Sequence, residues 1–209
     1  MSRVNLILCI ILFGYTFSSE AGDLVKSKME EYAVVPDVID EAPHEFLEVT
    51  YRSDVKADLG NELTPKQVKY IPDLDWNADE NELYTVLMTD PDAPGQLKEF
   101  RHWLVVNIPG KNVAKGKIIF DYIGSGPPKG TGLHRYIFLV FKQPNIISND
   151  NFVPNTSREG RPGTKARDLI KEYDLGVPVA GNFFRAQFDD YVPILHAQLG
   201  GPPPALKEV

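Results

Sequence analysis

The chain has 209 residues, of which 43% are hydrophobic and 24% are charged, a size and composition typical of one globular domain with a substantial core. Its net charge of −7 at pH 7 disfavours nucleic acid and anionic lipid surfaces as partners, because both repel a negatively charged protein. Any anion that the protein binds would therefore have to be held locally, in a pocket.

The N-terminus has the organisation of a secretory signal peptide that ends at residue 21. Arg3 precedes the apolar run LILCIILF, which is much shorter than the roughly 20 apolar residues that a transmembrane helix needs. The small residues Ser19 and Ala21 suit cleavage after Ala21, and cleavage after Ser18 is the alternative. We therefore predict a secreted, extracellular protein without a transmembrane segment.

Secretion bears on two further features of the sequence. Cys9, the one cysteine of the chain, lies in the signal peptide, so the mature protein has no disulfide, no thiol nucleophile and no thiolate metal ligand. Asn155 begins the sequon Asn155-Thr156-Ser157 in a segment rich in proline and asparagine. It is a predicted N-glycosylation site on a surface loop, with an unused sequon as the alternative.

The predicted elements are mainly strands. The segment DLVKSKMEEYAVV, at 23–35, is compatible with one short helix, FLEVTYR at 46–52 alternates as a half-buried strand does, and two prolines favour an extended segment at 63–76. Short β-branched and aromatic runs bounded by glycine, proline or asparagine predict four stronger strands, at 83–90, 102–109, 117–123 and 136–143. Nearly unbroken apolar runs indicate central strands covered on both faces, at 83–88 and 136–141.

Two helices are predicted near the C-terminus. Apolar residues from Ala166 to Tyr173 recur at helical spacing, with Thr164 as the expected N-cap and Gly176 as the expected C-cap. Residues 190–201 have the pattern of a closing helix, and the proline-rich residues 201–209 that of a loose tail. The sequence thus predicts a mostly β protein with a single domain at 22–209 and its core at 30–200.

Chemically capable side chains gather at the predicted strand ends. Asp90 and Asp92 follow the first strong strand in TDPDAPG, where a simple Asx-type turn is the alternative explanation. His102 begins the next strand, and His134 precedes the fourth. If these strand ends are adjacent, Asp90, His102 and His134 meet at one rim of a sheet and form a pocket.

The segment DYIGSGPPKGTGLHRY, at 121–136, would complete that pocket. Its glycines, Gly124 and Gly126 among them, allow close approach of a ligand, and successive N–H groups in such turns can bind an anion. Tyr136 adds a phenol. Asp90 repels an anion when it is ionised, but it could orient a histidine, carry a proton itself, or meet the amine of a zwitterionic ligand.

These segments resemble the signature sequences of the phosphatidylethanolamine-binding protein family, also called the Raf kinase inhibitor protein family. The resemblance rests on LYTVLMTDPDAPG, HWLVVNIPG and DYIGSGPPKGTGLHRYIFLVFKQ, and it extends over residues 30–200. With the signal peptide, the chain is similar to secreted, antennal-type members from insects. The resemblance implies a large antiparallel β-sheet packed on a smaller one, short C-terminal helices, and a small anion pocket formed by Asp90, Pro94, His102, Gly124, Gly126, His134 and Tyr136.

A few positions depart from the pattern of many relatives. Gly95 and Gln96 stand where many members have Ser-Arg, so the basic contact at the pocket rim is in doubt. Phe100 lies near the place of a rim tryptophan, and His196 stands where some relatives have a tyrosine. The preferred headgroup therefore does not follow from the resemblance.

The resemblance favours an extracellular binding protein for phospholipid headgroups or other small anionic or hydrophobic ligands, with no cofactor. The alternative is an extracellular interaction protein, such as a serine protease inhibitor or a signalling modulator. A third class, an enzyme, is not expected. The set of Asp90, His102 and His134 could in principle hold zinc or act as acid and base, but Ser125 lacks the Gly-x-Ser-x-Gly elbow of a serine nucleophile.

Overall fold

The computed structural model describes residues 21–201, so the predicted signal peptide up to Glu20 and the tail after Gly201 lie outside the described residues. Its strands form a large sheet in the order β1-β8-β7-β4-β5-β6 and a two-stranded sheet of β2 and β3. Their bounds are Glu45–Phe46 (β1), Glu48–Thr50 (β2), Asp73–Asp75 (β3), Leu83–Asp90 (β4), Phe100–Pro109 (β5), Lys117–Phe120 (β6), His134–Lys142 (β7) and Ala180–Ala186 (β8). This arrangement confirms the predicted mostly β fold of a large sheet on a smaller one. All pairs are antiparallel except β1 with β8, which makes the large sheet mixed at one edge.

The central strands are β4 and β7, as their apolar runs predicted. Val86 and Met88 of β4 face a cluster of buried side chains between the two sheets, whereas Leu87 faces a second cluster on the other side. Phe138 and Leu139 of β7 divide between the same two clusters. A strand that is buried on both faces needs an apolar residue at nearly every position, which explains the unbroken runs.

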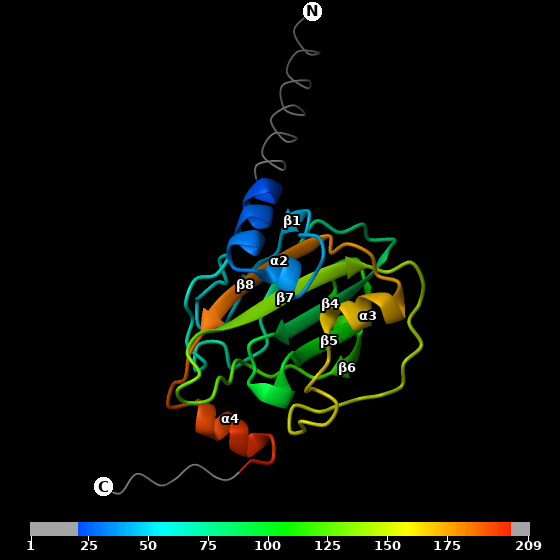
Figure 1. Ribbon diagram of the computed structural model, residues 1–209. Helices are drawn as coiled ribbons and strands as arrows, with labels where there is room; N and C mark the ends of the chain where they lie inside the picture. The colour runs from blue at the N-terminus through cyan, green and yellow to red at the C-terminus, as the bar shows by residue number, and fades with distance from the viewer. Residues whose placement is uncertain (1–20, 202–209) are drawn as a thin grey trace, which may run out of the picture.

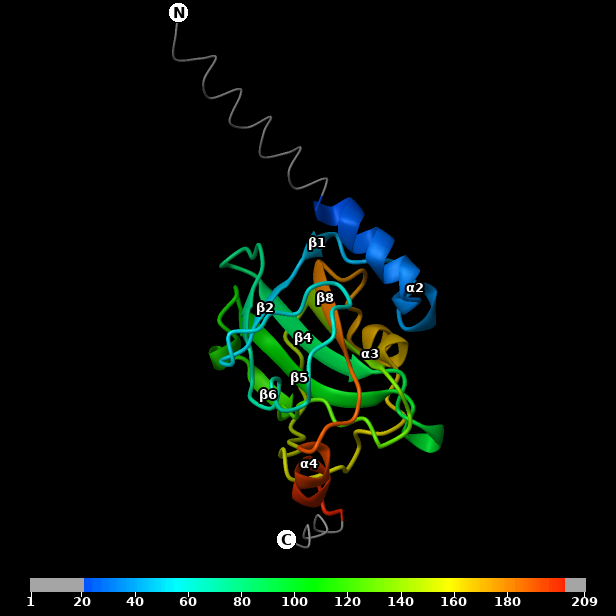
Figure 2. The same cartoon turned by 90° about the vertical axis from the view of Figure 1, so that its left-hand side faces the viewer.

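Different elements cover the two faces of the large sheet. The small sheet covers one face, and a helix at residues 21–31, with α2 (Val34–Asp37) and α3 (Ala166–Tyr173), covers the other. Figure 1 shows these helices in front of the sheet, and Figure 2 shows α3 and β2 on opposite sides of it. The last helix, α4 (Val192–Gln198), lies below one end of the strands. Two short 3-10 turns complete the elements, η1 at Gly95–Leu97 and η2 at Val113–Lys115.

Strand β8 was not among the predicted strands. It pairs with β7 along seven residues, from His134 opposite Ala186 to Val140 opposite Ala180. Its sequence, AGNFFRA, has a glycine and an asparagine where a strand pattern expects β-branched residues. Both are explained by close packing: an added Cβ at Gly181 would lie 2.4 Å from Pro43, and the Asn182 amide donates to the carbonyls of Leu47 and Ala57.

The caps of α3 differ from the prediction. Thr164 does not cap the helix, because its hydroxyl donates to the Arg161 carbonyl, 2.8 Å away. The N–H of Ala166 instead donates to Oε2 of Glu99 over 2.9 Å, so the cap comes from the residue before β5. At the other end the left-handed residue that stops the helix is Asp174, with φ of 52°, and not Gly176.

Replacing Glu99 by alanine should therefore lower the free energy of unfolding by about 1 kcal/mol, the usual value of a lost N-terminal cap. Glu172→Ala, an exposed glutamate on the same helix, is the matched control and should change stability by less than about 0.5 kcal/mol. Urea denaturation of both variants measures the difference. Equal effects of the two substitutions would rule out the cap.

Candidate functional site

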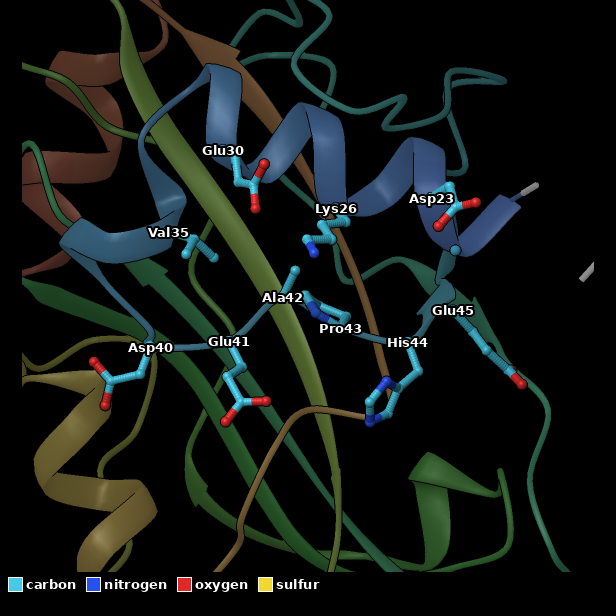
Figure 3. Close-up of a pocket in the computed structure, with 11 residues that line it drawn as sticks. Asp23, Lys26, Glu30, Val35, Asp40, Glu41, Ala42, Pro43, His44 and Glu45 are labelled. Carbon is cyan, nitrogen blue, oxygen red and sulfur yellow. The ribbon is translucent and has the colours of Figure 1, made fainter. Parts of the chain in front are cut away.

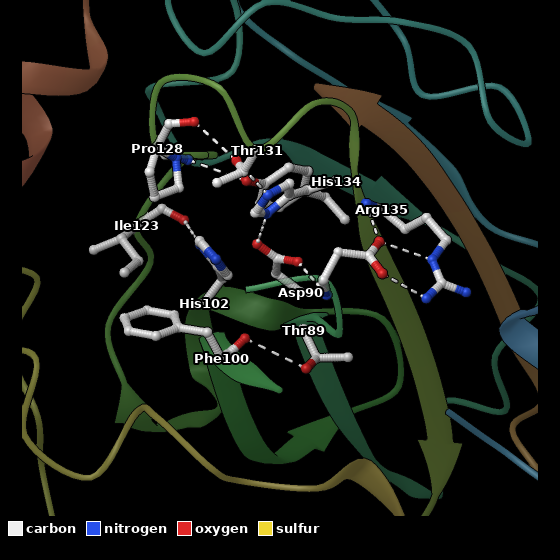
Figure 4. A network of polar contacts seen from close by, with 12 residues as sticks. Thr89, Asp90, Phe100, His102, Ile123, Pro128, Thr131, His134 and Arg135 are labelled. Atoms are coloured by element: carbon white, nitrogen blue, oxygen red, sulfur yellow. Dashed lines mark hydrogen bonds and ion pairs between the residues drawn. The ribbon is translucent and has the colours of Figure 1, made fainter. Parts of the chain in front are cut away.

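The predicted site residues converge because the strands that carry them are antiparallel. The end of β4 and the starts of β5 and β7 lie at the same end of the large sheet, where Asp90 pairs with Phe100 across β4 and β5. Asp90, His102 and His134 are all buried there, with exposed fractions of 1–3%. Figure 4 shows the three side chains turned toward one another above the strand ends.

A β-bulge places His102 in this group. Met88 and Thr89 are consecutive in β4, but their partners in β5 are Trp103 and Arg101, so His102 is an extra residue in the ladder. Strict alternation would send His102 to the face opposite Trp103. A bulge breaks that alternation and can re-aim a side chain, and here the His102 ring lies edge-on to Tyr136 at a centroid distance of 5.1 Å.

Asp90 and His134 form a buried, hydrogen-bonded pair. Nε2 of His134 lies 2.8 Å from the hydroxyl of Thr131, which is itself 2.8 Å from the Pro128 carbonyl. Nδ1 of His134 lies 2.9 Å from Oδ2 of Asp90, and one proton must lie between these two atoms. Asp90 thus orients the His134 ring, which is one of the roles that the sequence left open.

The second aspartate of the motif serves another purpose. The N–H of Asp92 donates to Oδ1 of Asp90 over 2.8 Å, which is the Asx-type turn that the sequence left open. The Asp92 carboxylate accepts from the backbone and guanidinium of Arg135, away from the pocket. Burial raises the pKa of Asp92, but the Arg135 hydrogen bonds outweigh it and hold that pKa below its usual value.

His102 is the titratable side chain with an unsatisfied atom in the pocket. Its Nδ1 lies 3.1 Å from the Ile123 carbonyl, which can only accept, so Nδ1 carries the hydrogen. Nε2 is buried and has no hydrogen-bond partner among residues 21–201. Burial lowers the pKa of His102 to about 4, against the attraction of Asp90. The ring is therefore neutral at pH 7, with a free lone pair on Nε2.

Two predicted site residues lie behind the pocket wall. The hydroxyl of Tyr136 accepts from the N–H of Gly126 over 3.3 Å, and burial with the nearby Asp90 holds the pKa of Tyr136 well above its usual value. An added Cβ at Gly124 would lie 2.7 Å from the Val68 carbonyl, so this glycine is required for packing. The N–H of Gly126 is thus occupied, which removes one of the backbone donors expected for an anion.

The strand-end pocket that results is small and has mostly apolar walls. Its volume is about 70 Å³, roughly twice the share of one water molecule in the liquid. Side chains of Pro94, Leu97, Phe100 and Ile123 line it, together with Leu195 and Leu199 at the C-terminal helix. Nε2 of His196 donates to the Gly126 carbonyl over 2.9 Å, so α4 is attached to the glycine loop and closes one side.

Sequence reasoning missed the cation of this pocket. Arg158 lines it, and its guanidinium makes no hydrogen bond or ion pair within the described part of the chain. The loop that carries Arg158 is held in place by buried Arg161, whose guanidinium donates to the carbonyls of His102 and Asp121. Arg158 therefore supplies a positive charge at a rim where Gly95 and Gln96 offer none.

A hollow beside the first helix does not form a comparable site. It measures about 680 Å³ and lies between that helix and residues 40–45 (Figure 3), but it is open and its charged lining is mainly carboxylate. No group of histidine, cysteine, aspartate or glutamate within 21–201 has the arrangement of a metal site. No helix in this range is long and apolar enough to cross a membrane.

Asn155, the predicted glycosylation site, lies in a turn beside the pocket. Its carbonyl accepts from the Gln198 amide of α4 over 2.9 Å, and its side chain is half-buried. Ser157 of the same sequon donates its N–H to the Pro154 carbonyl over 3.0 Å. Glycosylation of Asn155 stays a prediction.

Comparison with known proteins agrees with this geometry. The sequence matches the family described as phosphatidylethanolamine-binding protein over residues 42–184. It is 38% identical over 189 residues to the putative odorant-binding protein A5 of Drosophila melanogaster, with 88% of this chain and 90% of that relative covered.

Solved structures give the same result. The solution structure of CG7054 is similar with a TM-score of 0.67 and 46% identity, covering 79% of this chain and 97% of that one. Carboxypeptidase Y inhibitor, solved in complex with its cognate proteinase, is 26% identical with a TM-score of 0.68, covering 80% and 97%. The phosphatidylethanolamine-binding protein of Plasmodium vivax shares the fold at 18% identity, with a TM-score of 0.60 and coverage of 79% and 98%.

Proposed function

This chain belongs to the phosphatidylethanolamine-binding protein family, as its motifs predicted, and we propose that its strand-end pocket binds the phosphate of a phospholipid headgroup or of a similar small ligand. The observation that carries the proposal is the unpartnered Nε2 of His102, which is buried in a pocket that also contains Arg158. Buried polar atoms in proteins nearly always have a partner, so this atom favours a ligand there.

The chemistry of the pocket favours a phosphate that brings a proton. Neutral His102 has a lone pair on Nε2, which can accept from the P–OH of a monoester, or take up the proton and donate to the dianion. Arg158 offers a full positive charge, and the Asp90 carboxylate is already hydrogen-bonded to His134. The small volume suits the phosphate group itself and is too small for an acyl chain.

A secreted binding protein, rather than an enzyme, is the proposed class. The predicted N-terminal signal peptide supports secretion, and the name of the Drosophila melanogaster relative is that of a putative odorant-binding protein. Ser125, the serine of the glycine loop, is fully buried and its hydroxyl has no partner within residues 21–201, so no base is placed to activate it.

Calorimetric titration of the purified protein with phosphorylethanolamine and with inorganic phosphate tests the proposal. We expect saturable binding of both, and loss of binding in the Asp90→Ala, His134→Ala double variant. Arg158→Ala should weaken binding about fivefold, the effect of about one charged hydrogen bond at an exposed rim. Lys129→Ala, an exposed cation that does not line the pocket, is the matched control and should change affinity less than twofold.

Comparing the affinities of the two ligands distinguishes a site for a lipid headgroup from a site for phosphate alone. Tighter binding of phosphorylethanolamine indicates that the amine is recognised and points to a lipid headgroup, whereas equal affinity indicates a phosphate site. Unchanged binding in the double variant would refute the strand-end pocket as the site.

A second candidate function is inhibition of an extracellular serine protease. The similarity to carboxypeptidase Y inhibitor, at 26% identity over nearly its whole length, supports it. An assay of the protein against a panel of serine proteases decides the matter, and no inhibition at micromolar concentration would remove this candidate.

A further inference from the structure

A second cavity lies at the edge of the large sheet, away from the strand-end pocket. It opens between β5, β6 and the segment that leads into β3, and its volume is about 610 Å³, within the range of ligand pockets. We call it the edge cleft. Its apolar lining comes from Ile71, Leu74, Trp103, Val105, Val113 and Ile118.

The fold leaves this cleft open because the two sheets differ in width. The small sheet has two strands and cannot cover all six strands of the large one, and β6 lies at the uncovered edge. Ile71 and Ile118 are consequently 40% and 39% exposed, although both lie beside buried core residues. Adjacent exposed apolar side chains around a hollow are typical of a binding surface.

Trp103, one of the residues that line the edge cleft, has a polar atom without a partner in the described part of the chain. Trp103 is 1% exposed, and its indole Nε1 makes no hydrogen bond to any residue in 21–201. The nearest polar aromatic neighbour is Tyr122, edge-on at 5.6 Å, but its hydroxyl already donates to the Val68 carbonyl over 2.7 Å. A buried indole N–H normally has an acceptor. A ligand with one acceptor oxygen would supply it.

Charges at the rim limit the class of ligand. Lys111 is paired with Asp75 over 2.7 Å, so an acidic neighbour partly offsets its positive charge. Asp73 and Glu80 also line the rim and disfavour an anion. We propose that the edge cleft is a second ligand site, for an uncharged, mainly apolar molecule with one hydrogen-bond acceptor, such as an ester or a ketone.

A displacement experiment with a fluorescent apolar probe tests this site. The purified protein is loaded with N-phenyl-1-naphthylamine, which is then displaced by octyl acetate or by undecane, two molecules of similar length that differ in the ester group. We expect probe binding, and about fivefold stronger displacement by the ester, the ratio that one net hydrogen bond contributes. Undecane that displaces the probe as well as octyl acetate does would overturn the role of the indole N–H.

Substitutions test whether the probe binds in the edge cleft. Ile118→Glu places a charge at the mouth and should weaken probe binding at least tenfold, whereas Ile146→Glu, at an isoleucine that is 76% exposed and outside the cleft, should change it less than twofold. Trp103→Phe should retain probe binding but remove the preference for the ester. The Asp90→Ala, His134→Ala variant should bind the probe normally, which separates this site from the strand-end pocket. Equal effects of the two glutamate substitutions would refute the edge cleft as the site, and melting temperatures of all variants verify folding.

Discussion

Between pH 7 and pH 5 the free energy of unfolding should fall by about 2 kcal/mol because of His102 alone. The folded protein holds the pKa of His102 at about 4, mainly through burial, whereas the unfolded chain has a value near 6.5. Above pH 6.5 both states are neutral and His102 contributes nothing to the pH dependence. As the pH falls below 6.5 only the unfolded state gains the proton, so stability decreases until the pH reaches about 4.

His102→Gln should remove this decrease, because glutamine does not titrate. His44→Gln is the matched control: His44 is exposed at the opposite end of the sheet, and its replacement should leave the pH dependence of the parent protein intact. Urea denaturation at several pH values measures both. Identical pH profiles for His102→Gln and the parent would show that another group is responsible.

The same substitution connects stability with binding. A bound phosphate stabilises protonated His102, so the parent protein should bind phosphorylethanolamine about tenfold more tightly at pH 5.5 than at pH 7.5, with proton uptake. In His102→Gln the affinity should be weaker and should follow only the ionisation of the ligand. Calorimetry in buffers of different ionisation enthalpy measures the proton uptake directly.

The elements that were predicted correctly are those whose residue types are determined by the pattern of apolar residues within the element itself. Strands β4 and β7 were found because burial on both faces requires unbroken apolar runs. Strand β8 was missed because Gly181 and Asn182 are selected by contacts with Pro43 and Leu47, which are far away in the sequence. The cap of α3 was misassigned for the same reason, since Glu99 is distant from the helix that it caps.

The candidate site shows the same division. Asp90, His102 and His134 were predicted to converge, and they do. Because β4 pairs antiparallel with β5 and with β7, the end of β4 lies beside the starts of the other two strands. The bulge that re-aims His102 depends on the register between β4 and β5, which no local pattern contains. Arg158 comes from a loop without any periodic signal and is positioned by Arg161, so only the folded chain reveals it.

Substitution of Arg135 should be among the most destabilising changes outside the hydrophobic core. Its guanidinium donates to Asp92 and Asp37 and to the carbonyls of Tyr32 and Ala33, and so attaches the end of the first helical segment to β7. Arg135→Gln leaves the half-buried Asp92 without its cation, and we expect a loss of about 3 kcal/mol, the lower end for a broken buried pair. Arg52→Gln, at an exposed arginine, should cost less than about 0.5 kcal/mol.

The pH dependence of this loss has a defined sign. Because the pKa of Asp92 is lowered in the folded protein, its pairing with Arg135 stabilises fully above the ordinary aspartate pKa of about 3.9 and is lost as the pH falls through the lowered value. The stability difference between the parent and Arg135→Gln should therefore shrink in acid. A difference that stays constant from pH 7 to pH 2.5 would exclude the ion pair as its cause.

The two aspartates of Asp90-Pro91-Asp92 can then be separated by experiment. Asp92→Asn and Arg135→Gln remove the same ion pair, so their destabilisations should be less than additive in the double variant, and hydrogen exchange should increase at residues 21–33. Neither variant should weaken phosphorylethanolamine binding once the protein is folded, because Asp92 accepts from Arg135 on the side away from the strand-end pocket. Asp90→Asn should weaken that binding, because it replaces the carboxylate partner of His134 with a neutral amide. A large loss of affinity in Asp92→Asn would mean that the Asp92–Arg135 ion pair also shapes the pocket, and that stability and binding are coupled through this turn.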